Sequence, residues 1–370
     1  MPRPPAASAA SAASAPSASA RTIIARLLRR KRTAEAAAAR LPLSGSPIAA
    51  GERPHAGLVS GIALPFRKPG RNPSGGREYS AEIAGRTATL RFWTFNHHPL
   101  PLAELRAHAR RCFAWLFMLL PCSDDMAGSK GVLCDFLMFP DKRECPAEPE
   151  AVIEPVHCNG GISYLDREVA RFCVYREEEL FKVFVHETFH AFAVHGRFPE
   201  GAVANKLAGL GPKHRLEYPE VYGETWARII LVLFARGGSG GGGGHARGGG
   251  VDDVLAGLEA EAAYGWRGCV CVLGRVAANQ ARPQPTPAFE YYCLTGVAMV
   301  QHVSFLDWCA QHNRRCAGGV GFELQDPGAW LGWLGGVARD GLALAGEAAA
   351  SGGTGVGCGK SARMTWHDVV

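Results

Sequence analysis

The spacing of apolar residues between Phe181 and Gly196 predicts an amphipathic helix. At about 100° per residue, Phe181, Phe184, Val185, Phe189 and Phe192 fall on one broad side of that helix. Three glutamates precede the segment and suit the positive end of a helix dipole, and Gly196 follows it as a stop signal. We therefore expect a helix from Phe181 to His195 that packs its phenylalanine side into the core.

The patterns on the two sides of this helix differ. Strands are expected before it at residues 78–95 (two strands around an Ala-Gly-Arg turn), 131–139, 151–158, 162–165 and 168–175, with one helix at 102–120. Helices are expected after it at residues 219–235, 251–278, 289–311 and 330–345. The sequence therefore predicts an α+β fold with a strand-rich N-terminal half, an edge strand beside the central helix, and a helical C-terminal half.

Composition shifts suggest five regions along the chain. We expect a disordered basic tail at 1–50, a catalytic region at 51–236, a glycine-rich tether at 237–250, a helical region completing a cleft at 251–345, and a flexible tail at 346–370. Within the tail, Arg21–Arg30 could form a short basic amphipathic helix, as in a mitochondrial presequence. We favour a solvated tail and a cytoplasmic location, with a mitochondrial one as the alternative.

The charge and the cysteines exclude several classes of protein. The chain of 370 residues has a net charge of +6, but eight basic residues and one acid give residues 1–40 a charge of +7, which leaves about −1 for the rest. The folded body therefore has no basic footprint for nucleic acid, and no apolar run reaches the length of a membrane span. None of the 12 cysteines forms a Cys-x-x-Cys pair, so a zinc ribbon is not supported and buried free thiols are expected.

His186-Glu187-x-x-His190 is the motif that carries candidate chemistry. On a helix the two histidines lie about 40° apart, so both imidazoles can bind one Zn²⁺ ion, and the adjacent Glu187 can take a proton from the attacking water. The same letters also contain Glu-x-x-His, a di-iron signature, which needs a second such helix. The only other match, Glu154-Pro-Val-His157, is interrupted by proline, so a di-iron site is not supported.

A catalytic zinc site needs a third protein ligand, and we expect it to be Glu224. The candidates considered are Glu217, Glu220, Glu224, His195 and His214. His195 lies about 140° from His190 on the helix and is expected to point away, and Glu220 has a sufficient role at a helix start. Glu224 lies inside an apolar helix, where an unpaired carboxylate is costly, and its small neighbours permit close helix packing.

These residues resemble the gluzincins, the thermolysin-like and aminopeptidase-like zinc peptidases. The match is His186-Glu187-x-x-His190 followed by Glu224-x-x-Ala227 on a second helix. The resemblance implies a zincin-like fold in which His186, His190 and Glu224 bind one Zn²⁺ and Glu187 activates water. The gap to Glu224 is longer than usual in that family, and the Gly-x-Met-Glu-Asn motif of aminopeptidases is absent, so an endopeptidase is expected. The wider segment is also similar to uncharacterised metallopeptidase-like proteins of large DNA viruses and protists.

The remaining site residues are assigned from their positions. Asn159 and Gly160 lie in a tight turn that could present an edge strand to an extended peptide or protein substrate. Tyr291, Tyr292 and His302 are candidates for the donor to the oxyanion, and Tyr292 is the residue we select. The function expected is hydrolysis of peptide bonds; the alternative is an inactive zinc-binding scaffold of the same fold.

Overall fold

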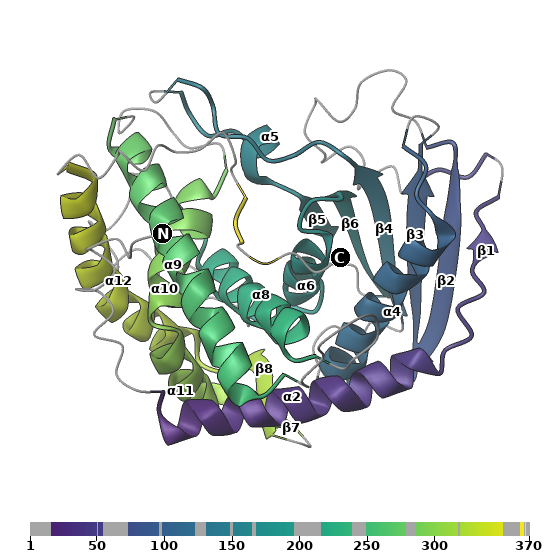
Figure 1. Ribbon diagram of the computed structural model, residues 1–370, viewed down its shortest axis with the longest axis horizontal. Helices are drawn as coiled ribbons and strands as arrows, with labels where there is room; N and C mark the ends of the chain where they lie inside the picture. Colours follow the sequence, from purple (N-terminus) through teal and green to yellow (C-terminus); the bar gives the residue numbers. More distant parts are fainter. Residues whose placement is uncertain are drawn as a thin grey trace.

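The computed structural model describes residues 16–49, 51–54, 73–95, 98–122, 131–148, 151–164, 168–195, 216–238, 249–278, 286–316, 319–350, 363–365 and 367. Its architecture is α+β, with a sheet in the N-terminal half and mostly helices in the C-terminal half (Figure 1). The strands are β1 (Ser46–Pro47), β2 (Gly75–Ile83), β3 (Arg86–Thr94), β4 (Gly131–Phe139), β5 (Gly161–Tyr164), β6 (Val169–Arg176), β7 (Asn313–Cys316) and β8 (Gly319–Leu324). The helices are α2 (Ala18–Ala39), α4 (Leu102–Leu119), η2 (Leu120–Cys122), α5 (Pro155–Cys158), α6 (Leu180–Ala191), α8 (Tyr218–Arg236), α9 (Val251–Ala278), η3 (Phe289–Leu294), α10 (Thr295–Val300), α11 (His302–His312) and α12 (Pro327–Ala350). The predicted α+β class, with a sheet in the N-terminal half and helices in the C-terminal half, is thus confirmed, but the strand expected at 151–158 is wrong, because Pro155 begins the short helix α5 there.

The main sheet has six strands in the order β1-β2-β3-β4-β6-β5. Strands β3, β4 and β6 run parallel, whereas β5 pairs antiparallel with β6 and forms one edge. Helix α6 packs on this part of the sheet through Phe184, whose ring centroid lies 5.5 Å from those of both Phe136 and Phe172. The expected edge strand beside the central helix is therefore present as β5.

The opposite face of the sheet is also covered. Trp93, Phe95, Leu137, Phe139 and Tyr175 form a second buried cluster there. Burial on both faces explains why β4 and β6 are apolar almost throughout, since parallel strands are normally covered on both sides. This apolar character made the two strands readable from the sequence.

Helix α2 corrects the expectation of a disordered N-terminal tail for residues 18–39, whereas residues 1–15 lie outside the described residues. It is 22 residues long and runs across the molecule beneath both the sheet and the C-terminal helices (Figure 1). Ile23, Ile24, Leu27 and Leu28 are at most 3% exposed and belong to the main core. The alternative reading of this segment, an amphipathic helix, is the one that the structure supports, with a protein surface as its partner.

The C-terminal half surrounds α8, which is buried over nearly all its length. Trp226 on α8 contacts Phe305 of α11 and Phe322 of β8, with ring centroids 5.4 and 5.1 Å apart. Figure 1 shows α8 between α6 on one side and α9 and α10 on the other. The hairpin β7–β8 was not predicted, and Phe322 from this hairpin also reaches Trp115 of α4.

Two further expectations are tested by the described residues. No helix among them is long and apolar enough to cross a membrane. Eight cysteines are free thiols, whereas Cys122 and Cys271 each take part in a disulfide bond, which corrects the expectation of free thiols at those two positions. His214 and most of the predicted tether, residues 239–248, lie outside the described residues.

Candidate metal centre

Helix α6 places His186, Glu187 and His190 in the interior of the molecule. His186 and Glu187 are each 6% exposed, because the phenylalanine side of α6 packs on the sheet and α8 covers the histidine side. The His186 and His190 rings are 4.7 Å apart, with their Nε2 atoms separated by 3.0 Å. One helical turn thus directs both Nε2 atoms to the same point.

The third group at this point is Glu220. Its Oε2 lies 3.1 Å from His186 Nε2 and 3.3 Å from His190 Nε2. Pro219 and Glu220 occupy the first turn of α8, and that turn faces the histidines of α6. His186, His190 and Glu220 form a group that could hold a metal ion.

The spacing of these three atoms fits a small divalent ion. A tetrahedral zinc site with bonds of about 2.0 Å separates neighbouring ligand atoms by about 3.3 Å. The observed separations of 3.0–3.3 Å are close to that value. Two imidazoles and one carboxylate are also a donor set found in catalytic zinc sites.

Glu224, which we expected to be the third ligand, has other partners. Both of its oxygens accept hydrogen bonds of 2.9 Å from Lys182 Nζ, and Oε1 accepts another of 3.2 Å from Arg228 Nε. Its Oε2 also lies 3.3 Å from His186 Nδ1, an ion-pair contact without the alignment of a good hydrogen bond. The buried Glu224 carboxylate does have a partner, but that partner is Lys182, one turn before His186, and not a metal ligand position.

His195 lies closer to the site than the sequence suggested. Helix α6 ends at Ala191, and Ala193 adopts a left-handed conformation with φ of 48°. The amides of Ala193 and Val194 then bond back to the carbonyls of His190 and Phe189, the pattern of a Schellman motif. This turn brings His195 Nε2 to 3.3 Å from His190 Nδ1. The expectation that His195 points away is wrong because the helix stops four residues early, at an alanine instead of Gly196.

Glu187 extends toward the edge strand β5. A Cβ atom added to Gly161 would lie 2.5 Å from Glu187 Oε1, so the carboxylate rests directly on the strand backbone. Gly160 is equally restricted, since a Cβ there would lie 2.4 Å from Arg143 Nη2. The Gly160-Gly161 pair therefore has a packing reason beyond the tight turn that the sequence indicated.

Asn159 has mainly structural contacts. Its Oδ1 accepts a hydrogen bond of 2.9 Å from Thr286 Oγ1, and its carbonyl accepts one of 2.8 Å from Arg176 Nε. Asn159, Gly160 and Gly161 nevertheless line the same cavity as Glu187. These contacts fix the start of β5 beside that carboxylate.

Of the candidate donors, Tyr291 is the one that lines the cavity. Its ring centroid lies 6.0 Å from that of His186. Tyr292, the residue selected from the sequence, is the next residue of the π-helix η3 and does not line this cavity; Arg143 and Cys158 are its charged and polar neighbours. His302 Nδ1 is 2.9 Å from the carbonyl of Met299, within its own chain turn. The two tyrosines are adjacent, and the α-helical period used for the sequence does not describe a π-helix. The sequence pattern therefore could not show which tyrosine faces the cavity.

The pKa values of the ionisable side chains in this site depend on their burial and on one another. Burial disfavours a charged His186, but Glu220 and Glu224 outweigh it and raise the pKa of His186 to about 10. Burial raises the pKa of Glu187, and the two histidines only partly offset this effect. Burial also raises the pKa of Tyr291 well above its usual value, with the acidic neighbours Glu220 and Glu187 adding to the rise. A carboxyl that binds protons readily and a phenol that stays protonated therefore lie beside the three-residue group.

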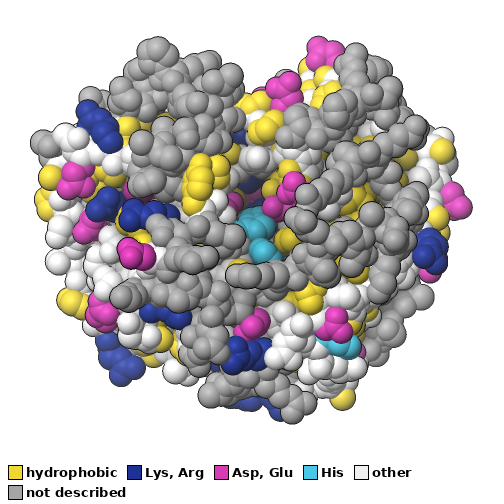
Figure 2. Space-filling model, turned by 180° about the vertical axis from the view of Figure 1, so that it is seen from behind, with side chains coloured by type: hydrophobic (Ala, Val, Ile, Leu, Met, Phe, Trp, Pro, Cys, Tyr) yellow, Lys and Arg dark blue, Asp and Glu magenta, His cyan; other side chains and the backbone are white. Residues whose placement is uncertain are grey.

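The cavity beside Glu187 is small. Its volume is about 20 Å³, enough for a water molecule but not for a side chain. Figure 2 shows histidine side chains at the bottom of a surface hollow, with acidic side chains beside them. The comparisons give no further identity, because no protein-family model, no curated protein and no solved structure matches this chain.

Proposed function

We propose that this protein is a zinc-dependent peptidase in which His186, His190 and Glu220 hold the metal. The observation that carries the proposal is the convergence of their three ligand atoms to within 3.0–3.3 Å, with Glu187 beside them on α6 and in contact with the edge strand β5. When bound, zinc supplies Lewis acidity, which polarises the scissile carbonyl and makes water more acidic. The arrangement of the other residues supports a gluzincin-like role for each.

Glu187 is the proton carrier in this proposal. Its raised pKa makes it an effective acceptor for the proton of the attacking water, and it can deliver that proton to the leaving nitrogen. Glu187 is held in place by contact with the backbone of Gly161. It therefore faces the region where an extended substrate would lie.

Tyr291 is the candidate for stabilising the oxyanion. A phenol with a raised pKa remains protonated at neutral pH and can donate a hydrogen bond to negative charge as it develops. Its position on the cavity wall supports this role over Tyr292. Arg228 Nη2 donates to the Tyr291 carbonyl at 3.2 Å and so ties η3 to α8.

Strand β5 is the candidate for binding the substrate main chain. It is the last strand of the six in the sheet order, and its only partner among the described strands is β6. Addition of an extended peptide to such an edge supplies hydrogen bonds that do not depend on side-chain sequence. This mode of binding favours peptides as the substrate class.

Glu224 and His195 have supporting roles in this proposal. The Glu224 carboxylate and the His195 imidazole each lie 3.3 Å from the Nδ1 atom of a ligand ring, a position from which they can orient that ring toward a bound metal. Such partners typically change metal affinity by about 10–100-fold.

The experiment that tests the proposal compares metal content and hydrolysis of a peptide library. Zinc binding should be lost in Glu220→Ala, and Glu187→Gln should keep its zinc while hydrolysis falls by about 100-fold or more. A wild-type protein that binds zinc but cleaves no peptide would support the alternative, an inactive zinc-binding scaffold. Retained hydrolysis in Glu187→Gln would refute the mechanism.

A further inference from the structure

A segment near the C-terminus, Arg363–His367, enters the interior beside the metal centre. In Figure 1 this segment passes between the helices of the C-terminal half and α6. Met364 and Thr365 are 3% and 1% exposed, although the described residues of the segment, 363–365 and 367, belong to neither a helix nor a strand. Its docking therefore depends on a small number of side-chain and backbone contacts.

Glu179 provides the principal contact to the backbone of this segment. Its Oε1 accepts hydrogen bonds from Met364 N at 3.0 Å, Thr365 N at 2.7 Å and Thr365 Oγ1 at 2.5 Å. Its Oε2 is paired with the buried guanidinium of Arg143. A carboxylate oxygen that binds two successive amides suits a main chain bent at that point, as at Met364, and it accepts varied sequences because the donors belong to the main chain.

Met364 extends from this backbone into the cavity beside Glu187. Its side chain lines that cavity together with Glu187, His186 and Tyr291. Its sulfur lies 3.2 Å from Lys182 Nζ, whose other contacts are the two oxygens of Glu224. A thioether is a weak acceptor for an ammonium group, so this contact is replaceable.

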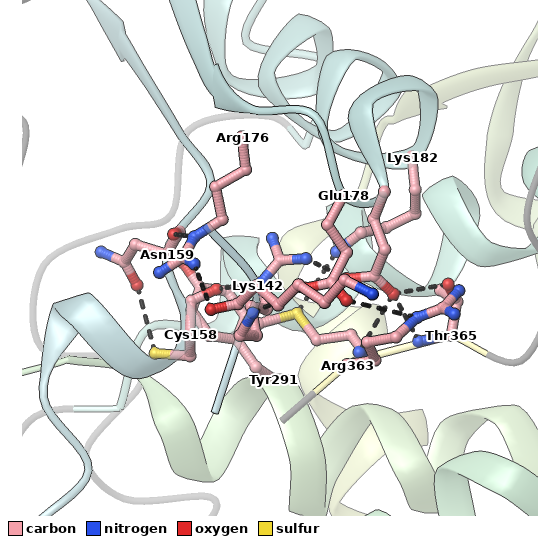
Figure 3. Close-up of polar contacts among 12 residues, drawn as sticks. Lys142, Cys158, Asn159, Arg176, Glu178, Lys182, Tyr291, Arg363 and Thr365 are labelled. Atoms are coloured by element: carbon pink, nitrogen blue, oxygen red, sulfur yellow. Dashed lines mark hydrogen bonds and ion pairs between the residues drawn. The ribbon is translucent and has the colours of Figure 1, made fainter. Parts of the chain in front are cut away.

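The rest of the segment spans the two halves of the molecule. Arg363 Nε lies 3.8 Å from Glu178 Oε1, and the Arg363 carbonyl accepts a hydrogen bond of 3.1 Å from Tyr264 Oη on α9. Further along, His367 Nε2 lies 3.2 Å from the carbonyl of Gly257, also on α9. Figure 3 shows Arg363 and Thr365 next to Glu178 and Lys182 at the start of α6.

We propose that the groove formed by Glu179, Lys182 and α9 is a peptide-binding site, which the chain fills with its own segment Arg363–His367. The ligand that it fits is a peptide bent at a residue with an unbranched apolar side chain: Glu179 binds the two amides at the bend, and the cavity beside Lys182 accepts the side chain. Occupation of this site closes one wall of the cavity that His186 and Glu187 line, and leaves it with a volume of only about 20 Å³. Release of the segment opens a continuous path from the groove to Glu187, so the segment acts as a removable occupant. Peptide binding in this groove requires neither a bound metal nor hydrolysis.

The experiment starts from the full-length folded protein. A recognition sequence for a site-specific protease is placed within residues 351–360, the chain is cut, and the nicked protein is titrated into a fluorescein-labelled peptide of residues 361–370. Fluorescence anisotropy should show saturable binding that the unlabelled peptide reverses. A peptide carrying Met364→Gly should bind at least about tenfold more weakly, because it lacks the side chain that fills the cavity.

Two adjacent glutamates supply a matched control. Nicked Glu179→Gln should bind the peptide about tenfold or more weakly, since a charge-assisted acceptor becomes neutral. Nicked Glu178→Gln should stay within about threefold, because its contact to Arg363 is long and partly exposed. Loss of circular dichroism on nicking, failure of the labelled peptide to exchange, or equal binding of a scrambled peptide would each overturn the proposal and make the segment a permanent part of the core.

Discussion

The Glu187 carboxylate lies on the backbone of Gly161, with no room for a side chain between them. A Cβ atom at position 161 would lie 2.5 Å from Oε1 and 2.7 Å from Cγ of Glu187. Strand β5 and helix α6 are thus held at a separation that only glycine permits. The position of the proposed proton carrier depends on this contact.

Gly161→Ala should therefore displace Glu187 and lower peptide hydrolysis by about 100-fold, because a shift of about 1 Å at a catalytic group can have that effect. Zinc content should be unchanged, since the three proposed ligands lie on α6 and α8. Gly75→Ala on β2 is the matched control, because a Cβ there meets nothing within 4 Å. Steady-state kinetics and metal analysis of both variants check the prediction, and full activity in Gly161→Ala would contradict it.

Replacement of Glu220 should remove the metal, whereas replacement of Glu224 should lower the stability of the protein. Glu220→Ala should lose most of the metal and remain folded, because its side chain lies at the start of α8 with its contacts directed to the two histidines. Glu224→Ala leaves Lys182 and Arg228 buried without their carboxylate, and such a loss costs about 3–5 kcal/mol of stability. Urea unfolding and metal analysis of the two variants distinguish these outcomes.

A contradictory result would have a definite meaning. If Glu224→Ala lost its metal without loss of stability while Glu220→Ala kept the metal, the ligand expected from the sequence would be correct. The four-residue spacing on α8 would then place the metal on the Nδ1 side of His186.

Helices and strands with a clear apolar period could be predicted from the sequence. The prediction failed where a turn ends such an element earlier than expected. The strands around Ala84-Gly85, the buried strand β4 and the long helix α9 lie where the apolar pattern placed them. Helix α6 ends early because Ala193 takes a left-handed conformation that sequence rules assign mainly to glycine. In the candidate site, the residue spacing within α6 was enough to predict that the two histidines lie together. The choice between Glu220 and Glu224 depends on the relative position of α6 and α8 along their axes, which the sequence does not show.

Long-range contacts could not be read from local pattern. Helix α2 has arginine-rich low-complexity surroundings that indicate a tail, and its packing partners on α4 and α11 are distant in the sequence. The docking of Met364 beside Lys182 spans 182 residues. In both cases the burial depends on a surface that exists only after the rest of the chain has folded.

The buried face of α2 should contribute strongly to stability. Leu27→Ala removes a side chain that is 1% exposed in the main core, and such truncations cost about 2–5 kcal/mol. Arg29→Ala, on the exposed side of the same helix, should change stability by less than about 0.5 kcal/mol. Equal urea midpoints for the two variants would show that α2 is not docked in solution.

Glu290 should make the protein less stable as pH rises above 5. Its side chain is fully buried on η3, and its Oε1 accepts a hydrogen bond of 2.8 Å from the amide of Glu217, the residue that precedes α8. Burial raises the pKa of Glu290 from 4.5 to about 7, against the lowering effect of the Glu217 amide. Because the folded state binds this proton more tightly than the unfolded state, its stabilising effect is complete below about pH 4.5 and is lost by about pH 7.

Glu290→Gln keeps an acceptor for the Glu217 amide but cannot ionise. The stability of the variant relative to the wild type should therefore rise between pH 5 and pH 8 by up to about 3 kcal/mol, the equivalent of a shift of that size. Urea unfolding at several pH values measures the difference, with Glu347→Gln on the exposed side of α12 as the control for removal of a carboxylate. A difference between Glu290→Gln and wild type that stays constant across this range would mean that Glu290 is ionised throughout, and that its Oε2 has a partner that stabilises the charge.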